Sequence, residues 1–158
     1  MRIAVYPGSF DPITVGHMDI LKRALAIFDK VIIAIAVNPK KKGVFPIEER
    51  IRIIKEATKG LEGVEVDSIE GLTVNYAKKV GAIALIRGLR AVTDFEYEFQ
   101  LSAANTFADS SIETVFFMSR QETTFISSST INELYSNGVD ISSLVPPAVM
   151  EAYERLGK

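Results

Sequence analysis

Short apolar runs alternate with amphipathic segments along this chain. Five runs are rich in β-branched residues and have the length of strands that are buried on both faces of a parallel sheet. They cover residues 2–6, 31–37, 64–68, 82–86 and 113–118. Between them, apolar residues recur at the three- and four-residue spacing of helices. This spacing predicts helices over residues 17–28, 47–58, 74–80, 94–107, 131–135 and about 147–156.

Several expected helices begin with residue types that favour a helix start. Pro46 precedes one helix, and Thr73 is a good N-cap residue for the next. Thr93 and Glu96 have the spacing of a capping box at the start of a third. The alternation of strands and helices predicts an α/β fold: a single Rossmann-like, doubly wound domain over residues 1–158, with a five-stranded parallel sheet and helices on both faces.

Composition narrows the class of protein. The chain has 158 residues, 47% hydrophobic and 24% charged, with a net charge of −2, which is typical of one soluble globular domain. This charge does not favour a nucleic-acid partner. The sequence has no cysteine and one histidine, which excludes thiolate catalysis and argues against a transition-metal site. No segment reads as a signal peptide or a membrane span, so we expect a cytoplasmic protein without a membrane partner.

Polar clusters follow four of the expected strands, at residues 9–17, 38–42, 87–90 and 119–129. In a parallel sheet these clusters share one edge, where ligands of doubly wound domains bind. The first cluster leads into a helix whose first turn holds His17, the only histidine. The N–H groups at a helix N-terminus bind anions, and the other clusters add cations and hydroxyls. Together they predict a ligand with several phosphates.

The sequence around these clusters resembles a known family. Thr14-Val15-Gly16-His17 is similar to the T/H-x-G-H signature of the nucleotidyltransferase superfamily, and residues 126–131 are similar to its serine-rich signature. With Tyr-Pro-Gly-Ser-Phe-Asp-Pro at 6–12 and Ile-Arg-Gly-Leu-Arg at 86–90, followed by 94–98, the whole chain resembles the bacterial phosphopantetheine adenylyltransferase family.

This resemblance implies an enzyme that transfers the adenylyl group of ATP to 4′-phosphopantetheine, giving dephospho-coenzyme A and pyrophosphate, the penultimate step of coenzyme A synthesis. The substrate phosphate would attack the α-phosphate in line, without a covalent intermediate. Two alternatives stay open: a cytidylyltransferase or nicotinate-mononucleotide adenylyltransferase, against which residues 87–90 and 94–98 argue, and a nucleotide-binding module without catalysis. An aminoacyl-tRNA synthetase fragment is set aside, because the chain lacks a second signature with lysine.

The resemblance assigns three residues to catalysis. His17 would stabilise the transition state as a donor to the ATP phosphates, although a histidine at a helix start can also serve structure alone. Lys41 and Arg87 would bind the phosphate of the pantetheine substrate. For Lys41, which lies in a run of three lysines, the alternative is an ordinary solvated loop.

Further residues are assigned to the two substrates by the same resemblance. The substrate phosphopantetheine would contact Ser9, Lys41, Thr73 and Arg87. ATP would contact Ser9, Phe10, His17, Gly88, Leu89, Arg90, Glu98, Thr123, Thr124, Phe125, Ile126, Ser127, Ser128 and Ser129. Structural alternatives are a simple turn at Ser9, an ion pair of Arg90 with Asp94 or Glu96, an exposed helix acid at Glu98, an N-cap at Thr73 and a flexible linker at the serine run.

The resemblance also concerns cofactors and assembly. Mg²⁺ is expected mainly on the ATP phosphates, and no residue is assigned as its ligand. A homohexamer is implied, for which the apolar residues at 95–107 and 145–153 are candidates, and feedback binding of coenzyme A stays open. Asn132 stands where many superfamily members carry Arg or Lys, which removes one cation from the expected phosphate site.

Overall fold

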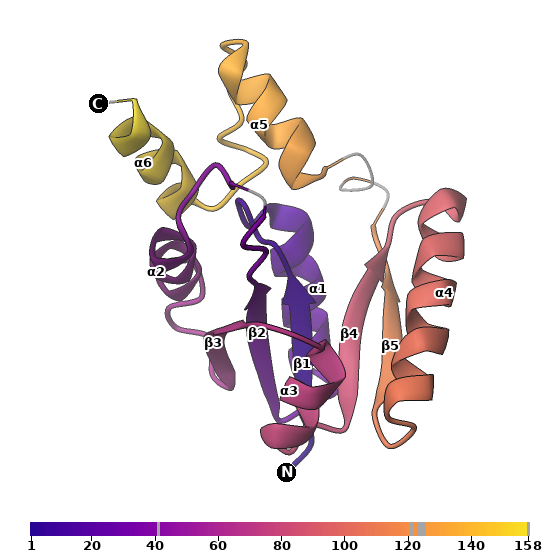
Figure 1. Ribbon diagram of the computed structural model, residues 1–158. Helices are drawn as coiled ribbons and strands as arrows, with labels where there is room; N and C mark the ends of the chain where they lie inside the picture. The colour runs from indigo at the N-terminus through magenta and orange to yellow at the C-terminus, as the bar shows by residue number, and fades with distance from the viewer. Residues whose placement is uncertain (41, 121, 123–125, 158) are drawn as a thin grey trace.

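The five expected strands form one parallel sheet, with the strand order β3-β2-β1-β4-β5 (Figure 1). The computed structural model describes residues 1–40, 42–120, 122 and 126–157, without the side chains of 92 and 93. The strands are β1 (Ile3–Gly8), β2 (Lys30–Ala36), β3 (Val64–Ile69), β4 (Ala84–Leu89) and β5 (Glu113–Met118). The sheet therefore confirms the predicted architecture and all five apolar runs.

Two strands continue beyond their apolar runs. β1 includes Gly8, which is paired with Ile35, and β4 includes Arg87 and Leu89, which are paired with residues of β5. The expectation that the cluster 87–90 follows the strand is therefore wrong for its first three residues. Backbone pairing with a neighbouring strand extends these strands, and hydrophobicity does not report that pairing.

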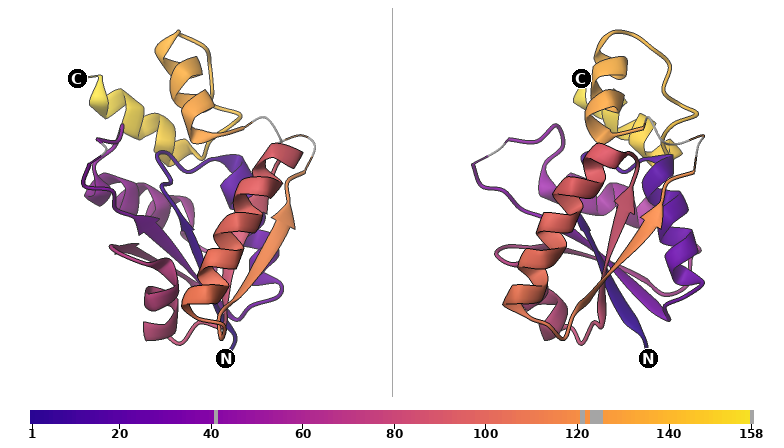
Figure 2. Two further views of the ribbon diagram at one scale, coloured as in Figure 1. Left: turned by 45° about the vertical axis from the view of Figure 1, so that its right-hand side comes forward. Right: turned by 90° about the vertical axis from the view of Figure 1, so that its right-hand side faces the viewer.

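Helices cover both faces of the sheet (Figure 2). The helices are α1 (Val15–Leu25), α2 (Ile47–Ala57), α3 (Thr73–Lys79), α4 (Val92–Ala108), α5 (Ser128–Ser136) and α6 (Pro147–Leu156). Successive residues of β1 face opposite sides: Ala4 and Tyr6 pack in one buried cluster with α1 and α2, and Val5 packs in a second cluster with α3. In Figure 2, α1 and α4 lie on opposite sides of β4 and β5.

Four helices begin earlier than the sequence predicted: α1, α3, α4 and α5 start at Val15, Thr73, Val92 and Ser128 instead of residues 17, 74, 94 and 131. Thr73 is the first residue of α3 and Leu72 is its N-cap, with no side-chain capping bond, so the N-cap interpretation of Thr73 is wrong. α4 begins at Val92, before the expected start, with the extended backbone of Ala91 as its N-cap. The carboxylate of Asp94 accepts a hydrogen bond from the backbone N–H of Arg90 at 3.2 Å and secures this turn. The side chain of Thr93, on which the expected capping box depends, lies outside the described residues.

The strand order reverses at the centre of the sheet. β1 is paired with β2 on one side and with β4 on the other, so the chain leaves the carboxyl ends of β1 and β4 in different directions. α5 and α6 lie beyond these carboxyl ends (Figure 1). A crevice at such a reversal is where ligands of doubly wound sheets bind. Among the described residues, no helix has the length and apolarity needed to cross a membrane.

Candidate active site

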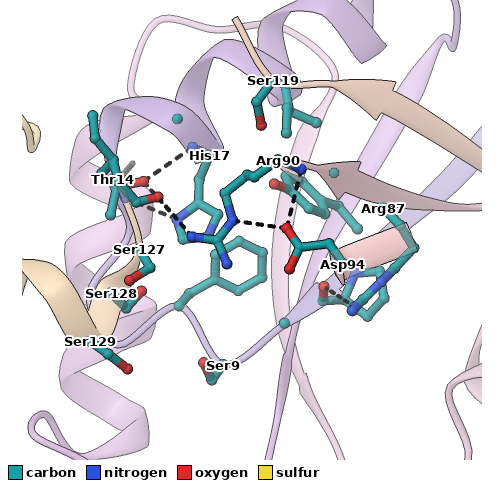
Figure 3. A pocket seen from close by; sticks show the side chains of 18 of the residues that line it. Ser9, Thr14, His17, Arg87, Arg90, Asp94, Ser119, Ser127, Ser128 and Ser129 are labelled. Atoms are coloured by element: carbon teal, nitrogen blue, oxygen red, sulfur yellow. Dashed lines mark hydrogen bonds and ion pairs between the residues drawn. The ribbon is translucent and has the colours of Figure 1, made fainter. Parts of the chain in front are cut away.

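A cavity of about 340 Å³ lies at the reversal of strand order. Its walls are the turn after β1, the first turn of α1, the end of β4 with the start of α4, and the first turn of α5 (Figure 3). Residues from three of the four predicted polar clusters, 9–17, 87–90 and 119–129, therefore meet at one edge of the sheet, whereas no described residue of the cluster 38–42 lines the cavity.

The start of α1 holds His17 in one orientation. Thr14 is the N-cap, and its hydroxyl accepts the backbone N–H of His17 at 3.3 Å. In return, Nδ1 of His17 accepts the backbone N–H of Thr14 at 3.0 Å. Because Nδ1 is an acceptor, the neutral imidazole carries its proton on Nε2. Within the described part of the chain, Nε2 has no partner, so its N–H is available to a ligand of the cavity.

The surroundings of His17 keep its ring uncharged. Burial, with the charge of Arg90 adding to it, lowers the pKa of His17 to about 4. Phe10 packs edge-on against the imidazole with 4.9 Å between ring centroids, and Tyr6 lies behind both. His17 is therefore a neutral hydrogen-bond donor at pH 7 and not a cation.

The three serines at the start of α5 make different contacts. Ser127 is the N-cap, and its hydroxyl accepts the N–H of Thr130 at 3.1 Å. The hydroxyl of Ser128 donates to the carbonyl of Pro12 at 2.8 Å, which attaches α5 to the turn after β1. Ser129 is exposed in the cavity wall, and its hydroxyl has no partner among the described residues. The linker alternative is wrong for this part of the run.

Two helix N-termini thus face the same cavity. Gly16 in α1 and Ser128 and Ser129 in α5 occupy first-turn positions, whose N–H groups have no acceptor within their own helix. Neither first turn contains an acidic residue. The positive ends of both helix dipoles are therefore available to an anion.

Arg87 and Glu98 form a partly buried ion pair in the wall of the cavity. Nε and Nη2 of Arg87 donate to the two carboxylate oxygens of Glu98 at 2.8 and 2.6 Å, and Nη1 donates to the carbonyl of Pro7 at 3.3 Å. Glu98 is 7% exposed, so its interpretation as an exposed helix acid is wrong.

Arg90 forms the ion pair that its sequence context suggested. Its Nε lies 3.5 Å from a carboxylate oxygen of Asp94, one helical turn further along. Its Nη1 donates to the carbonyl of Ile126 at 3.5 Å, which links the end of β4 to the segment before α5. The pair is partly exposed at the cavity, so Arg90 can still meet a ligand there.

The turn between β1 and α1 is fixed from outside the cavity. The carboxylate of Asp11 accepts the N–H groups of Val44 and Phe45 and lies 3.3 Å from Nη2 of Arg50. Arg50 also donates to the carbonyl of Ser9 at 3.3 Å. These contacts hold Phe10 at a φ of 45°, which is unfavourable for a residue with a Cβ.

Most of the predicted site residues lie together in this cavity. Its lining includes Ser9, Phe10, His17, Arg87, Gly88, Arg90, Glu98, Ile126, Ser127, Ser128 and Ser129. The buried side chain of Leu89 and the residue Thr73 are not part of the lining. Lys41, Thr123, Thr124 and Phe125 lie outside the described residues.

The lining also contains residues that were not predicted individually as site residues. Tyr6, Pro7 and Gly8 belong to the motif at 6–12, and Ser119 belongs to the predicted polar cluster 119–129. Ile20 was not predicted, although its position three residues after His17 places it on the same helix face.

Asn132 makes structural contacts outside the cavity. Its Nδ2 donates to the carbonyl of Asp11 at 3.0 Å, and its Oδ1 accepts the hydroxyl of Tyr153 in α6. The position that carries a cation in many superfamily members here joins α5, α6 and the turn after β1. Asn132 is not among the residues that line the cavity.

Comparisons with known proteins agree with this geometry. The model of the cytidylyltransferase-like family matches residues 5–134. Proteins named phosphopantetheine adenylyltransferase are similar along nearly their whole length. That of Caldanaerobacter subterraneus subsp. tengcongensis is 50% identical over 96% of this chain and 94% of the relative. That of Geotalea daltonii is 51% identical over 98% of this chain and 96% of the relative. A putative nicotinate-nucleotide adenylyltransferase from Vibrio parahaemolyticus has a similar fold, with a TM-score of 0.75 and 20% identity over 96% of this chain and 91% of that chain. The chain therefore belongs to the cytidylyltransferase-like family and, within it, to the phosphopantetheine adenylyltransferases.

Proposed function

We propose that this protein transfers the adenylyl group of ATP to 4′-phosphopantetheine, yielding dephospho-coenzyme A and pyrophosphate. The names of relatives about 50% identical over nearly the whole chain support this reaction. In it, a phosphate oxygen of phosphopantetheine forms a bond to the α-phosphorus of ATP. The bond from that phosphorus to the bridging oxygen of the β-phosphate breaks, and pyrophosphate leaves.

The observation that carries the proposal is the neutral N–H donor of His17 between two helix N-termini. The attacking oxygen is already an anion, so the reaction needs no general base. It needs donors aimed at the oxygens of the α-phosphate, where negative charge increases in the transition state. Nε2 of His17 suits this role because Thr14 fixes the ring and its low pKa keeps it neutral at pH 7.

The remaining donors suit the two substrates. We assign ATP to Ser9, Phe10, Gly88, Leu89, Arg90, Glu98 and the segment 123–129, and phosphopantetheine to Ser9, Lys41, Thr73 and Arg87. The start of α5 supports this division, because its N–H groups and the hydroxyl of Ser129 suit the β- and γ-phosphates.

Mg²⁺ would bind mainly through the phosphates of ATP and neutralise part of their charge. The described acids in the cavity lining are Asp94 and Glu98, and each is paired with an arginine. We therefore assign the ion to phosphate oxygens and water, which is a common arrangement for magnesium in nucleotide sites.

We further propose a single domain over residues 1–158, a cytoplasmic location and assembly into a homohexamer. The polar, phosphorylated substrates support the location. Exposed aromatic side chains on α4 support self-association, because a large apolar patch on a surface marks a contact. Coenzyme A contains parts of both substrates, which supports its feedback binding in the same cavity.

Pyrophosphate release from Mg-ATP and 4′-phosphopantetheine tests the reaction. We expect turnover by the wild-type protein and a drop in kcat of about 10²–10³-fold for His17→Ala, because one preorganised donor is lost. ATP binding without pyrophosphate release would instead indicate a nucleotide-binding module. A His17→Ala variant with the wild-type rate would remove His17 from the mechanism.

A further inference from the structure

The ion pair of Asp11 and Arg50 joins two segments that follow neighbouring strands. Asp11 belongs to the turn after β1, and its carboxylate accepts the N–H groups of Val44 and Phe45, between β2 and α2, at 2.7 and 2.8 Å. Arg50 extends from α2 and donates through Nε to the carbonyl of Phe45 at 2.7 Å and through Nη1 to the carbonyl of Ser9 at 3.3 Å. Its Nη2 lies 3.3 Å from the carboxylate of Asp11. The three nitrogens of one guanidinium therefore hold the two segments at a defined separation.

The two segments belong to different parts of the proposed site. Ser9 and Phe10 in the turn line the cavity, and the ring of Phe10 packs against that of His17 with 4.9 Å between the centroids. The other segment, residues 43–45, begins two positions after Lys41, which the proposed function assigns to phosphopantetheine. The pair thus connects the wall assigned to the α-phosphate of ATP with the loop assigned to the attacking phosphate.

The pair lies behind the cavity and not in it. The side chains of Asp11 and Arg50 are 14% and 9% exposed, and neither residue is part of the described lining. A buried ion pair adds little net stability, because desolvation offsets the attraction between its charges. Hydrogen bonds are directional, so the main effect of this pair is to define where the attached segments lie.

Gly43 is packed directly against the pair. A Cβ at this position would overlap Nη2 of Arg50 and would lie 2.5 Å from Oδ2 of Asp11. The backbone of Gly43 is outside the left-handed region, so other residues can adopt its conformation. An alanine at position 43 would therefore disturb the ion pair without straining the backbone.

We propose that Arg50, together with Asp11, is a positioning residue for adenylyl transfer: it sets the separation between the turn after β1 and residues 43–45. The inference rests on the proposed function. Each substrate can still bind when this separation changes, because the two helix N-termini and the N–H of His17 are not part of the pair. In-line attack needs both phosphates aligned at the same time, so a small displacement lowers the rate of the chemical step.

The test measures kcat and both KM values for the wild type, Arg50→Lys, Gly43→Ala and Arg52→Lys. Lysine keeps the charge beside Asp11 but has one nitrogen in place of three, and Gly43→Ala displaces the guanidinium without changing any charge. We expect kcat per folded protein to fall about tenfold or more in both variants, with each KM within about threefold of the wild type. Arg52 is an exposed arginine of α2 that is paired with Glu49, so Arg52→Lys should keep the wild-type kcat.

Circular dichroism and denaturant unfolding determine the folded fraction of each variant. A merely structural role would lower the total rate only through the amount of folded protein, and kcat per folded molecule would stay at the wild-type value. If Arg50→Lys does not fold, Gly43→Ala decides the question, because it leaves both charges of the pair in place.

Three results would overturn this inference while leaving the proposed function intact. One is a smaller fall in kcat than expected in a folded Arg50→Lys or Gly43→Ala variant. Another is a KM raised beyond the expected range in either variant, which would make the pair part of substrate binding. The third is an equal fall in kcat for Arg52→Lys. Absence of turnover by the wild type would instead refute the proposed function, and that result is distinguishable because the wild type is measured first.

Discussion

The imidazole of His17 is fixed by its own helix. The N–H of Thr14 occupies Nδ1, and the rings of Phe10 and Tyr6 occupy the space beside it. This contact defines which nitrogen carries the proton, and burial prevents a second proton from binding at neutral pH. The capping contact and the burial that orient the Nε2–H of His17 toward the cavity therefore also keep the ring uncharged at neutral pH.

The low pKa of His17 makes folding stability depend on pH. An unfolded chain protonates this histidine near its ordinary value of 6.5, whereas the folded protein does so at about 4. Between these values the unfolded state binds the additional proton, so the free energy of unfolding decreases as the pH falls, by up to about 1.4 kcal/mol per pH unit from this group. We expect His17→Gln to flatten this part of the curve, because glutamine can accept the same capping bond without titrating.

Denaturant unfolding of both proteins from pH 4 to 7 measures this difference. The unfolding free energies of wild type and variant should converge or cross as the pH is lowered, since the variant lacks the proton-linked loss. Parallel curves across this range would show that the folded and unfolded states bind a proton at residue 17 equally well.

Individual roles at the site were only partly visible in the sequence. The motif predicted that His17 and the serine run meet, and the structure confirms that they share a cavity. The motif did not distinguish Ser128 from Ser129. Which of the two hydroxyls donates to the carbonyl of Pro12 depends on the residue at which α5 begins, and the motif does not specify that residue. Nor did it pair Arg87 with Glu98, because eleven positions across a strand and a helix have no recognisable spacing.

At the scale of elements, the start of α5 separates a structural serine from a ligand-facing one. Ser128 supplies the carbonyl of buried Pro12 with a donor, and exposed Ser129 faces the cavity. The two residues are adjacent and chemically identical, so each is the control for the other. We therefore expect the contacts of each serine, and not its chemistry, to determine how its substitution changes stability and ATP binding.

We expect Ser128→Ala to lower the free energy of unfolding by about 1 kcal/mol, because a buried carbonyl loses its donor. Ser129→Ala should leave stability unchanged and raise the KM for ATP about tenfold to a hundredfold, as expected for the loss of one hydrogen bond to a charged group. Denaturant unfolding and steady-state kinetics on both variants check this division. Equal effects of the two variants on both quantities would contradict it.

The elements themselves were predictable because hydrophobic burial sets their positions. Each of the five apolar runs became a strand. β1 and β2 are buried on both faces, whereas β3 and β5 lie at the sheet edges and are largely only partly buried. Element ends depended on other forces. β4 continues through Arg87 because it pairs with β5, and α3 begins at Thr73 without a side-chain cap. Pairing and capping depend on tertiary context that local sequence does not contain.

In the molecule as a whole, much of the surface of α4 is uncovered. Phe95, Tyr97, Phe99 and Phe107 of α4 are between 52% and 94% exposed. The rings of Phe95 and Phe99 lie 5.9 Å apart, one helical turn from each other. Aromatic side chains grouped on an exposed face are typical of a protein contact. Phe95 lies three residues before Glu98 on the same helix, so an interface there would border the site.

We expect Phe99→Glu to shift the protein from the proposed hexamer toward smaller species, because it places a charge in an apolar contact. Sedimentation velocity at several concentrations measures the change, with Glu96→Gln as the control on the same helix. A wild-type protein that sediments as a monomer at every concentration would refute the hexamer. An unchanged hexamer in Phe99→Glu would place its interface elsewhere.

The paired helix N-termini also have a practical consequence. The N–H groups of Gly16, Ser128 and Ser129 have no acceptor within their own helices, so we expect the cavity to bind small oxyanions as well as nucleotides. Sulfate or phosphate in a purification or assay buffer would then occupy the place of a substrate phosphate. Such buffers would raise the melting temperature and weaken inhibitors at the same time. Ligand screens on this protein therefore belong in buffers free of sulfate, phosphate and carboxylates, with chloride as the anion.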